Sequence, residues 1–101
     1  MEDSDRFSGL TRRVIAGVHV PVAERLPARL LGLAFLPRER AGPGLLIPRC
    51  RSVHTVGMRF PLDLVFLGSG GEVIRRVPAV PPGRLVGERR AHSVLELPAG
   101  D

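Results

Sequence analysis

The stretch PLDLVFLGSGGEVIRRV, residues 61–77, decides the fold class of this chain. Its first part, residues 61–67, is apolar on both alternating faces apart from Asp63, a pattern typical of a central strand covered on both sides. The glycine-rich segment that follows, residues 68–71, favours a turn because glycine adopts positive φ at no steric cost. Residues 62–77 therefore predict a β-hairpin within a mostly β domain.

Short segments on both sides of this hairpin have strand character as well. RRVIAGVHVPV, residues 12–22, alternates with a period of two and predicts a strand. A short helix is predicted from about residue 27 to residue 33, with Pro27 as its first residue, because the fixed φ of proline suits that position. Further strands are predicted at residues 45–48, 52–58, 84–87 and 92–100.

Many short strands separated by Gly and Pro turns favour a sandwich or a barrel. We therefore expect a single-domain β-sandwich or partly closed barrel of six or seven short strands with one short α-helix. The domain is expected to span residues 11–101, after a flexible lead-in at residues 1–10.

The composition limits the class of protein. A chain of 101 residues is long enough for one domain and one modest core. It has no apolar run long enough for a transmembrane helix, and its acidic start, MEDSDRFSG, lacks the basic and apolar regions of a signal peptide. One cysteine permits no internal disulfide, which fits a reducing compartment. We expect a cytoplasmic protein without a membrane span, either a monomer or a weak dimer.

The net charge of +5 suggests a nucleic-acid binder at first sight. However, all 15 basic residues are arginine, and they are scattered along the chain, which indicates a compositional bias rather than a surface selected for phosphate contacts. Proteins that bind single-stranded nucleic acids interleave aromatic side chains for base stacking, whereas this chain has four phenylalanines and no other aromatic residue. The sequence therefore predicts no nucleic-acid partner.

The hairpin is flanked by further distinctive segments: GPGLLIPRCRSVHTVGMRF at residues 42–60, PPGR at residues 81–84 and SVLELPAG at residues 93–100. With these segments, the chain resembles the domain of unknown function 192 family over about residues 12–100. The resemblance implies a compact, mostly β domain with one short helix. That family has no established activity, so no catalytic residue or cofactor is implied. The chain departs from the family pattern at its GSGG turn, which has no acidic residue before the last glycine, and at Pro27 in the helix.

Cys50, His54 and Met58 form a trio of soft or borderline metal ligands at a spacing of four residues. Along an extended strand, four residues span about 13 Å, whereas the ligands of one metal ion each lie about 2.0–2.3 Å from it. The trio can meet only if the chain bends sharply, for example at Gly57. We therefore predict no metal and no cofactor, with Met58 as a core residue, and keep a copper carrier as an alternative.

Asp63 is the most informative single residue in the sequence. A carboxylate in so apolar a strand must be paired, hydrogen-bonded or open to a cleft, and Arg59 or His54 is its expected partner. One interpretation is a structural ion pair that fixes the register of the strand. The other is a polar pocket lined by His54, Arg59 and Asp63, in which Arg59 anchors a small anionic or polar ligand.

These residues leave three functions open. The leading hypothesis is a non-enzymatic binding or accessory module that uses the pocket at His54, Arg59 and Asp63. The first alternative is a hydrolase-like enzyme in which His54 and Asp63 form an acid–base pair. The second is a soft-metal carrier through Cys50, His54 and Met58. The sequence leans away from an enzyme because His54 lies in the middle of a predicted strand, where a structural role is more common.

Overall fold

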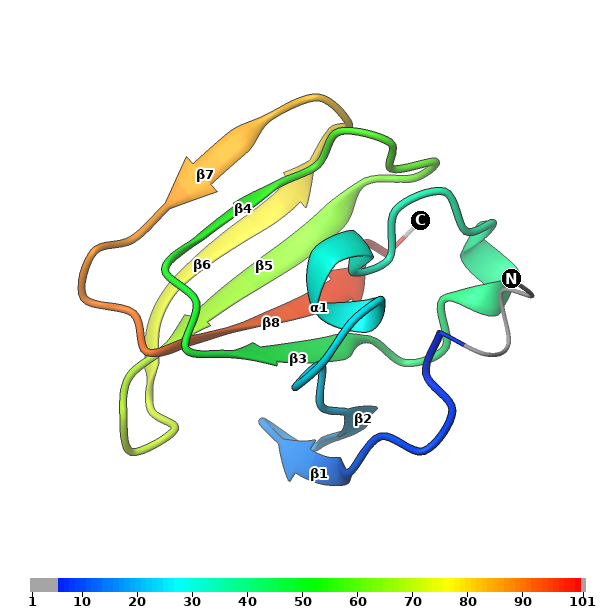
Figure 1. Cartoon of the computed structure of the whole chain (residues 1–101). Helices are drawn as coiled ribbons and strands as arrows, with labels where there is room; N and C mark the ends of the chain where they lie inside the picture. Colours follow the sequence, from blue (N-terminus) through cyan, green and yellow to red (C-terminus); the bar gives the residue numbers. More distant parts are fainter. Residues whose placement is uncertain (1–5, 101) are drawn as a thin grey trace.

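The computed structural model describes residues 6–100 of the chain (Figure 1). The fold class predicted from the sequence is confirmed: the described residues form antiparallel sheets with one short α-helix, and these sheets do not close into a barrel. No helix in residues 6–100 has the length and apolar character needed to span a bilayer. The elements in chain order are β1 (Arg12–Ile15), β2 (Val18–Pro21), α1 (Ala28–Leu31), the 3-10 helix η2 (Arg38–Arg40), β3 (Leu45–Pro48), β4 (Ser52–His54), β5 (Leu62–Leu67), β6 (Val73–Val80), β7 (Leu85–Gly87) and β8 (Ser93–Pro98).

The main sheet has four antiparallel strands in the order β3-β8-β5-β6. Strand β5 lies inside this sheet, as its apolar character predicts, and the C-terminal strand β8 lies inside it as well. In the β5–β8 pair, Leu64 lies opposite Glu96, and Asp63 lies opposite Leu97. Because directly opposed residues share a face and neighbours alternate, Glu96 and Asp63 point to opposite faces of the sheet.

Each face of the main sheet is covered by a different layer (Figure 1). The face that carries Leu64 and Phe66 packs against α1 and against Val53 of the small β4–β7 sheet. The face that carries Val65 packs against the β1–β2 hairpin. Both faces are therefore apolar, which explains why β5 is a nearly continuous apolar run rather than an alternating one.

The single strand predicted over residues 12–22 is wrong. This segment is a hairpin in which β1 pairs with β2, and Val14 lies opposite His19. The chain reverses at Ala16 and Gly17, both of which have positive φ (50° and 80°). A two-residue turn with positive φ at both positions normally carries Asn, Asp or Gly. Because position 16 is alanine, the sequence gives no clear signal for this turn.

Other element boundaries also differ from the prediction. Helix α1 begins at Ala28, one residue after Pro27, and ends at Leu31. Strand β4 ends at His54, because residues 55–57 turn, with Gly57 at a φ of 84°. Strand β6 continues through Pro78 to Val80, since it lies at the edge of the sheet, where a missing N–H is tolerated.

A β-bulge in β6 lies beside Asp63. The β5–β6 register moves from Leu62 opposite Val80 to Leu64 opposite Val77, so β6 has one extra residue there. The Asp63 carboxylate accepts a hydrogen bond from the backbone N–H of Ala79 at 2.8 Å. The expectation that Asp63 needs a polar partner is met by a backbone donor, rather than by the side chain of Arg59 or His54.

The N-terminal residues that the structure describes are tied to the chain after α1. Residues 1–5 of the predicted lead-in lie outside the described residues. Arg6 is buried, and its guanidinium donates to the backbone carbonyls of Gly32 and Ala34 at 3.1 and 2.7 Å. Phe7 packs against the core on the α1 side of the sheet. This contact helps to hold the turn after α1 against the sheet.

Thr55 is fully buried and links β4 to the proline-rich segment before β7. Its hydroxyl donates to the carbonyl of Pro81 at 2.7 Å and accepts from the N–H of Arg84 at 2.8 Å. We expect Thr55→Val to lower the free energy of unfolding by about 1–2 kcal/mol, because both backbone groups lose their partner. Urea denaturation measures this change. Thr11→Val, at an exposed site, is the matched control, and an equal loss there would contradict the role given to Thr55.

Candidate functional site

A carboxyl group lies buried in the centre of the main sheet. Glu96 belongs to β8, where it lies between Leu45 of β3 and Leu64 of β5, and only 4% of its surface is exposed. Its side chain points to the face that α1 covers, where both neighbouring leucines are fully buried. An ionisable group in such surroundings is rare unless it is paired, so the partners of Glu96 decide what it can do.

The two oxygens of this carboxyl group differ in their contacts. The backbone of Leu33, just after α1, provides one hydrogen bond to the group. The other oxygen, Oε1, is buried and finds no hydrogen-bond partner among residues 6–100. Burial raises the pKa of Glu96 to about 7, and the hydrogen bond from Leu33 opposes this shift only in part. Glu96 therefore changes between its neutral and charged forms near physiological pH.

Gly32 lies directly against the unpaired oxygen. This residue ends α1 with a φ of 55°, a backbone conformation that favours glycine. A Cβ atom placed on Gly32 would lie 2.8 Å from Oε1 of Glu96. The glycine is therefore required both by the turn and by the close approach of the carboxyl group.

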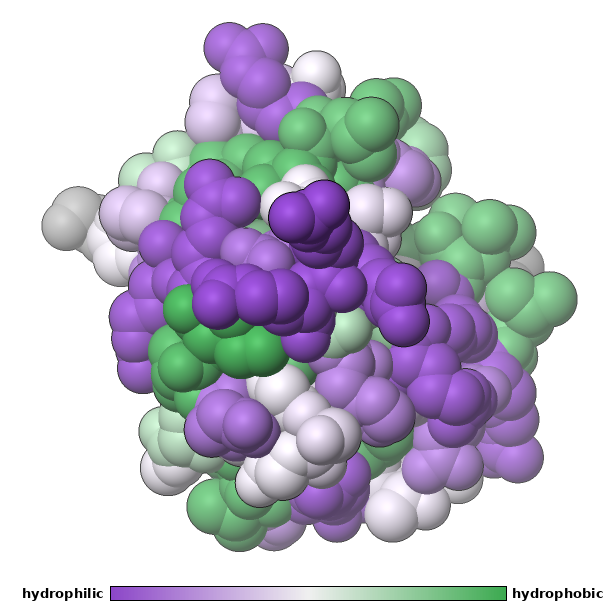
Figure 2. All heavy atoms as spheres, turned by 90° about the vertical axis from the view of Figure 1, so that its left-hand side faces the viewer, coloured by the Kyte–Doolittle hydropathy of each residue, from purple (hydrophilic) through white to green (hydrophobic). Residues whose placement is uncertain are grey.

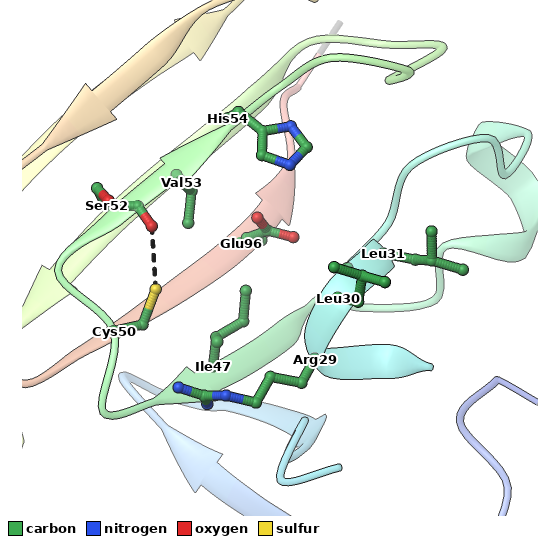
Figure 3. Close-up of a pocket in the computed structure, with 10 residues that line it drawn as sticks. Arg29, Leu30, Leu31, Ile47, Cys50, Ser52, Val53, His54 and Glu96 are labelled. Carbon is green, nitrogen blue, oxygen red and sulfur yellow. Dashed lines mark hydrogen bonds between the residues drawn. The ribbon is translucent and has the colours of Figure 1, made fainter. Parts of the chain in front are cut away.

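Glu96 lines a cavity of about 240 Å³ between α1, β3, β4 and β8 (Figure 3). Its apolar walls come from Leu30 and Leu31 of α1, Ile47 of β3 and Val53 of β4. Figure 3 shows Glu96 between these strands and α1, with the ring of His54 on the neighbouring strand β4. The remaining lining residues are Arg29, Gly32, Cys50, Ser52 and His54.

The structure does not gather the three site residues predicted from the sequence. His54 is exposed on β4 and lines the Glu96 cavity. Asp63 points to the opposite face of the sheet, where it lines a separate recess with Arg76 and Leu97. Arg59 is exposed and belongs to neither lining. His54 and Asp63 therefore do not meet as an acid–base pair, and only His54 belongs to the pocket described above.

The three soft metal ligands considered from the sequence, Cys50, His54 and Met58, do not share one site either. Cys50 and His54 line the same cavity, whereas Met58 is buried in the core, as predicted, and does not line it. The Cys50 thiol donates to the carbonyl of Ser52 at 3.1 Å (Figure 3). Within residues 6–100, no three His, Cys, Asp or Glu side chains are grouped so that they can hold a metal ion.

A second recess has a different character. It lies at the end of the molecule seen in Figure 2, which presents mainly hydrophilic side chains, and it encloses about 320 Å³ beside Arg49, Arg51 and His92. These three side chains are exposed to water, which screens their charges. The fold thus brings two arginines of the loop between β3 and β4 beside His92 of the loop before β8, although this recess has no buried polar group of the kind found at Glu96.

Glu96 was missed as a site residue by reasoning from the sequence. The alternation in residues 92–100 places Glu96 on the same side as Val94, and this signal is visible in the sequence. Because β8 lies inside the sheet, Glu96, like Asp63, is a carboxylate in an apolar strand that needs a partner. Short apolar strands at a C-terminus are also found at sheet edges, so the alternation alone does not separate a buried carboxyl group from a solvated one.

The comparisons with known proteins agree with this architecture. A family model, DUF192, described as "Uncharacterized ACR, COG1430", matches residues 9–101. The chain belongs to the DUF192 family. The family resemblance inferred from the sequence is thus confirmed over nearly the whole chain, and with it comes no known activity. No curated protein matches this DUF192 chain.

Two solved structures share the fold of this DUF192 domain. One is a protein of unknown function from Novosphingobium aromaticivorans DSM 12444, with a TM-score of 0.63 and 16% identity, over 99% of this chain and 88% of the other. The second is a proposed transcription regulator from Sinorhizobium meliloti 1021, with a TM-score of 0.65 and 24% identity, over 88% of this chain and 78% of the other. At these identities the two structures support the fold alone.

Proposed function

We propose that this DUF192 domain is a non-enzymatic binding module whose small polar ligand enters the cavity between α1 and β8 and forms a hydrogen bond with Glu96. The observation that carries the proposal is the buried Oε1 atom of Glu96, which lacks a partner among the described residues and belongs to a residue that lines an open cavity. Sites for small molecules are typically concave and apolar, with few polar groups that fix orientation. The cavity of Glu96 has this composition.

Of the three site residues predicted from the sequence, His54, Arg59 and Asp63, only His54 belongs to the proposed site. It lines the cavity from β4 and is exposed, so it can contact a ligand that reaches Glu96. The anionic ligand anchored by Arg59, which the sequence favours, has less support because Arg59 does not line the cavity. Asp63 already has a backbone partner and lies on the other face.

A ligand screen by thermal shift tests the proposal. A ligand of this pocket is expected to raise the melting temperature of the unmodified chain and to raise that of Glu96→Gln much less. Asp63→Asn is the matched control, because it changes a carboxyl on the opposite face and keeps an oxygen that can accept from Ala79. A shift that survives in Glu96→Gln would contradict the proposal. If Arg59→Ala abolishes the increase in melting temperature, the ligand binds at the pocket predicted from the sequence rather than at Glu96.

An acid–base enzyme is a second candidate, and one observation favours it. Burial raises the pKa of Glu96 to about 7, where a carboxyl group can both take up and release a proton at neutral pH. In such an enzyme Glu96 would replace Asp63 as the partner of His54. Conversion of a bound ligand into a product, observed by NMR and lost in Glu96→Gln, would favour this candidate over a binding module.

A further inference from the structure

We propose that the ligand of the Glu96 cavity is a small organic cation, which donates a hydrogen bond from an ammonium or guanidinium nitrogen to Glu96 Oε1 and places a short apolar portion against Leu30 and Ile47. This inference rests on the proposed function and adds the chemical class of the ligand. It follows from the partners that Glu96 has, from those that it lacks, and from the size of the cavity.

The first argument is the missing partner of a buried carboxylate. Buried charges in proteins are almost always paired, because an unpaired charge in apolar surroundings is strongly disfavoured. Glu96 has a hydrogen bond from the Leu33 backbone and lines the cavity, yet its buried Oε1 atom has no partner among the described residues. A cation that enters the cavity would supply the hydrogen bond and the opposite charge together.

The second argument is that nearby guanidinium groups are directed elsewhere. Arg29 lines the cavity, but its guanidinium donates to the carbonyls of Pro48 and Arg49, and Figure 3 shows it along β3, away from Glu96. The guanidinium of Arg6 donates to two carbonyls of the turn after α1. The Arg29 guanidinium is thus bound to backbone carbonyls, and Oε1 has no hydrogen-bond partner among residues 6–100, which leaves this oxygen for a ligand.

The third argument is the size and polarity of the cavity. Its volume of about 240 Å³ is below the range of about 300–1,000 Å³ typical of sites for drug-sized molecules. The apolar residues of its lining are Leu30, Leu31, Ile47 and Val53. A compact ligand with one charged nitrogen and a few carbon atoms matches this volume and these apolar residues, whereas a nucleotide is too large for the cavity.

If the ligand is a cation, its affinity for the Glu96 cavity should depend on pH in a defined direction. Only ionised Glu96 attracts a cation, and because burial raises the pKa of Glu96 to about 7, affinity should increase as the pH rises through neutrality. The other titratable or charged groups facing the cavity are His54, Cys50 and Arg29. A carboxylate ligand would show the opposite dependence.

Titrations of the full chain followed by amide NMR test the inference, with four probes: propylamine, guanidine, propionamide and propionate. Propylamine or guanidine is expected to shift the amides of Gly32 and Leu33, with a dissociation constant at least about tenfold lower at about pH 8.5 than at about pH 5.5. Glu96→Gln should abolish both the shifts and their pH dependence. His54→Gln should retain the pH dependence, which separates the carboxyl group from the imidazole, and Asp63→Asn should behave like the unmodified chain.

The remaining outcomes separate the two proposals. Propionate that binds at these amides more tightly at low pH would overturn the cation class, since Glu96 would then act as a protonated donor, while the binding function would stand. Preferential binding of propionamide at both pH values would have the same consequence. If no probe of any class shifts the amides that line the cavity, the cation class and the small-ligand function both fail.

Discussion

Glu96→Gln is expected to stabilise the protein above neutral pH. Burial raises the pKa of Glu96 from 4.5 to about 7, so the folded state binds more protons than the unfolded state between these values. The free energy of unfolding therefore carries a contribution that is fully present below about pH 4.5, declines as the pH rises, and is lost above about pH 7. At about 1.4 kcal/mol for each pKa unit, the loss amounts to about 3 kcal/mol. Glutamine has no proton to lose and keeps its stability throughout.

Chemical denaturation at a series of pH values measures this effect. The difference in unfolding free energy between the Glu96→Gln variant and the unmodified chain should increase by about 3 kcal/mol from about pH 4.5 to about pH 8. Glu24→Gln makes the same chemical change at an exposed residue and should leave the pH profile unaltered. A constant difference across the series would show that folding leaves the pKa of Glu96 unchanged, and it would contradict the effect given to burial.

Phe66→Ala is the second substitution for which we expect a large effect. Phe66 lies in β5, is fully buried, and packs on the α1 side of the sheet opposite Val94 of β8. Truncation of a buried phenylalanine removes apolar contacts and leaves a cavity, which typically lowers the free energy of unfolding by about 3–5 kcal/mol. In a domain of this size, such a loss is a large part of the total stability.

Urea or guanidinium denaturation measures the change, and the chain provides a matched control. Phe35 is 60% exposed, and Phe35→Ala makes the same truncation at the surface. We expect that control to change the unfolding free energy by about 0.5 kcal/mol or less. Similar losses at both positions would mean that the α1 side of the sheet is not the main core of the domain.

The parts of the fold that depend on local patterns were predictable from the sequence. The hairpin of β5 and β6 follows from an apolar run, a glycine-rich turn and a second strand, and the structure has it. The turn at Ala16 and Gly17 was missed because alanine rarely adopts positive φ, so the alternating pattern continued through it. The strand order was not predictable, since the pairing of β8 with both β3 and β5 depends on contacts between distant segments.

In the candidate site, too, the features that depend on local sequence were predictable, and those that depend on contacts between distant segments were not. Reasoning from the sequence found His54 because its residue type is chemically distinctive, and it predicted that Asp63 needs a polar partner. It did not identify the backbone of Ala79 as that partner, because a bulge in the neighbouring strand creates the contact. It also passed over Glu96, whose importance depends on burial between two strands that lie far from each other in the chain.

The bulge beside Asp63 has a consequence for how the domain behaves in a crowded solution. An open sheet edge is a template on which another chain can add a strand, and proteins protect such edges with proline, charge and local kinks. Strand β6 has all three: Pro78 lacks an N–H, Ala79 turns its N–H to Asp63, and Arg75 and Arg76 are exposed. The Asp63 carboxylate, which the sequence suggests as a site residue, thus helps to protect this edge from the addition of a strand by another chain.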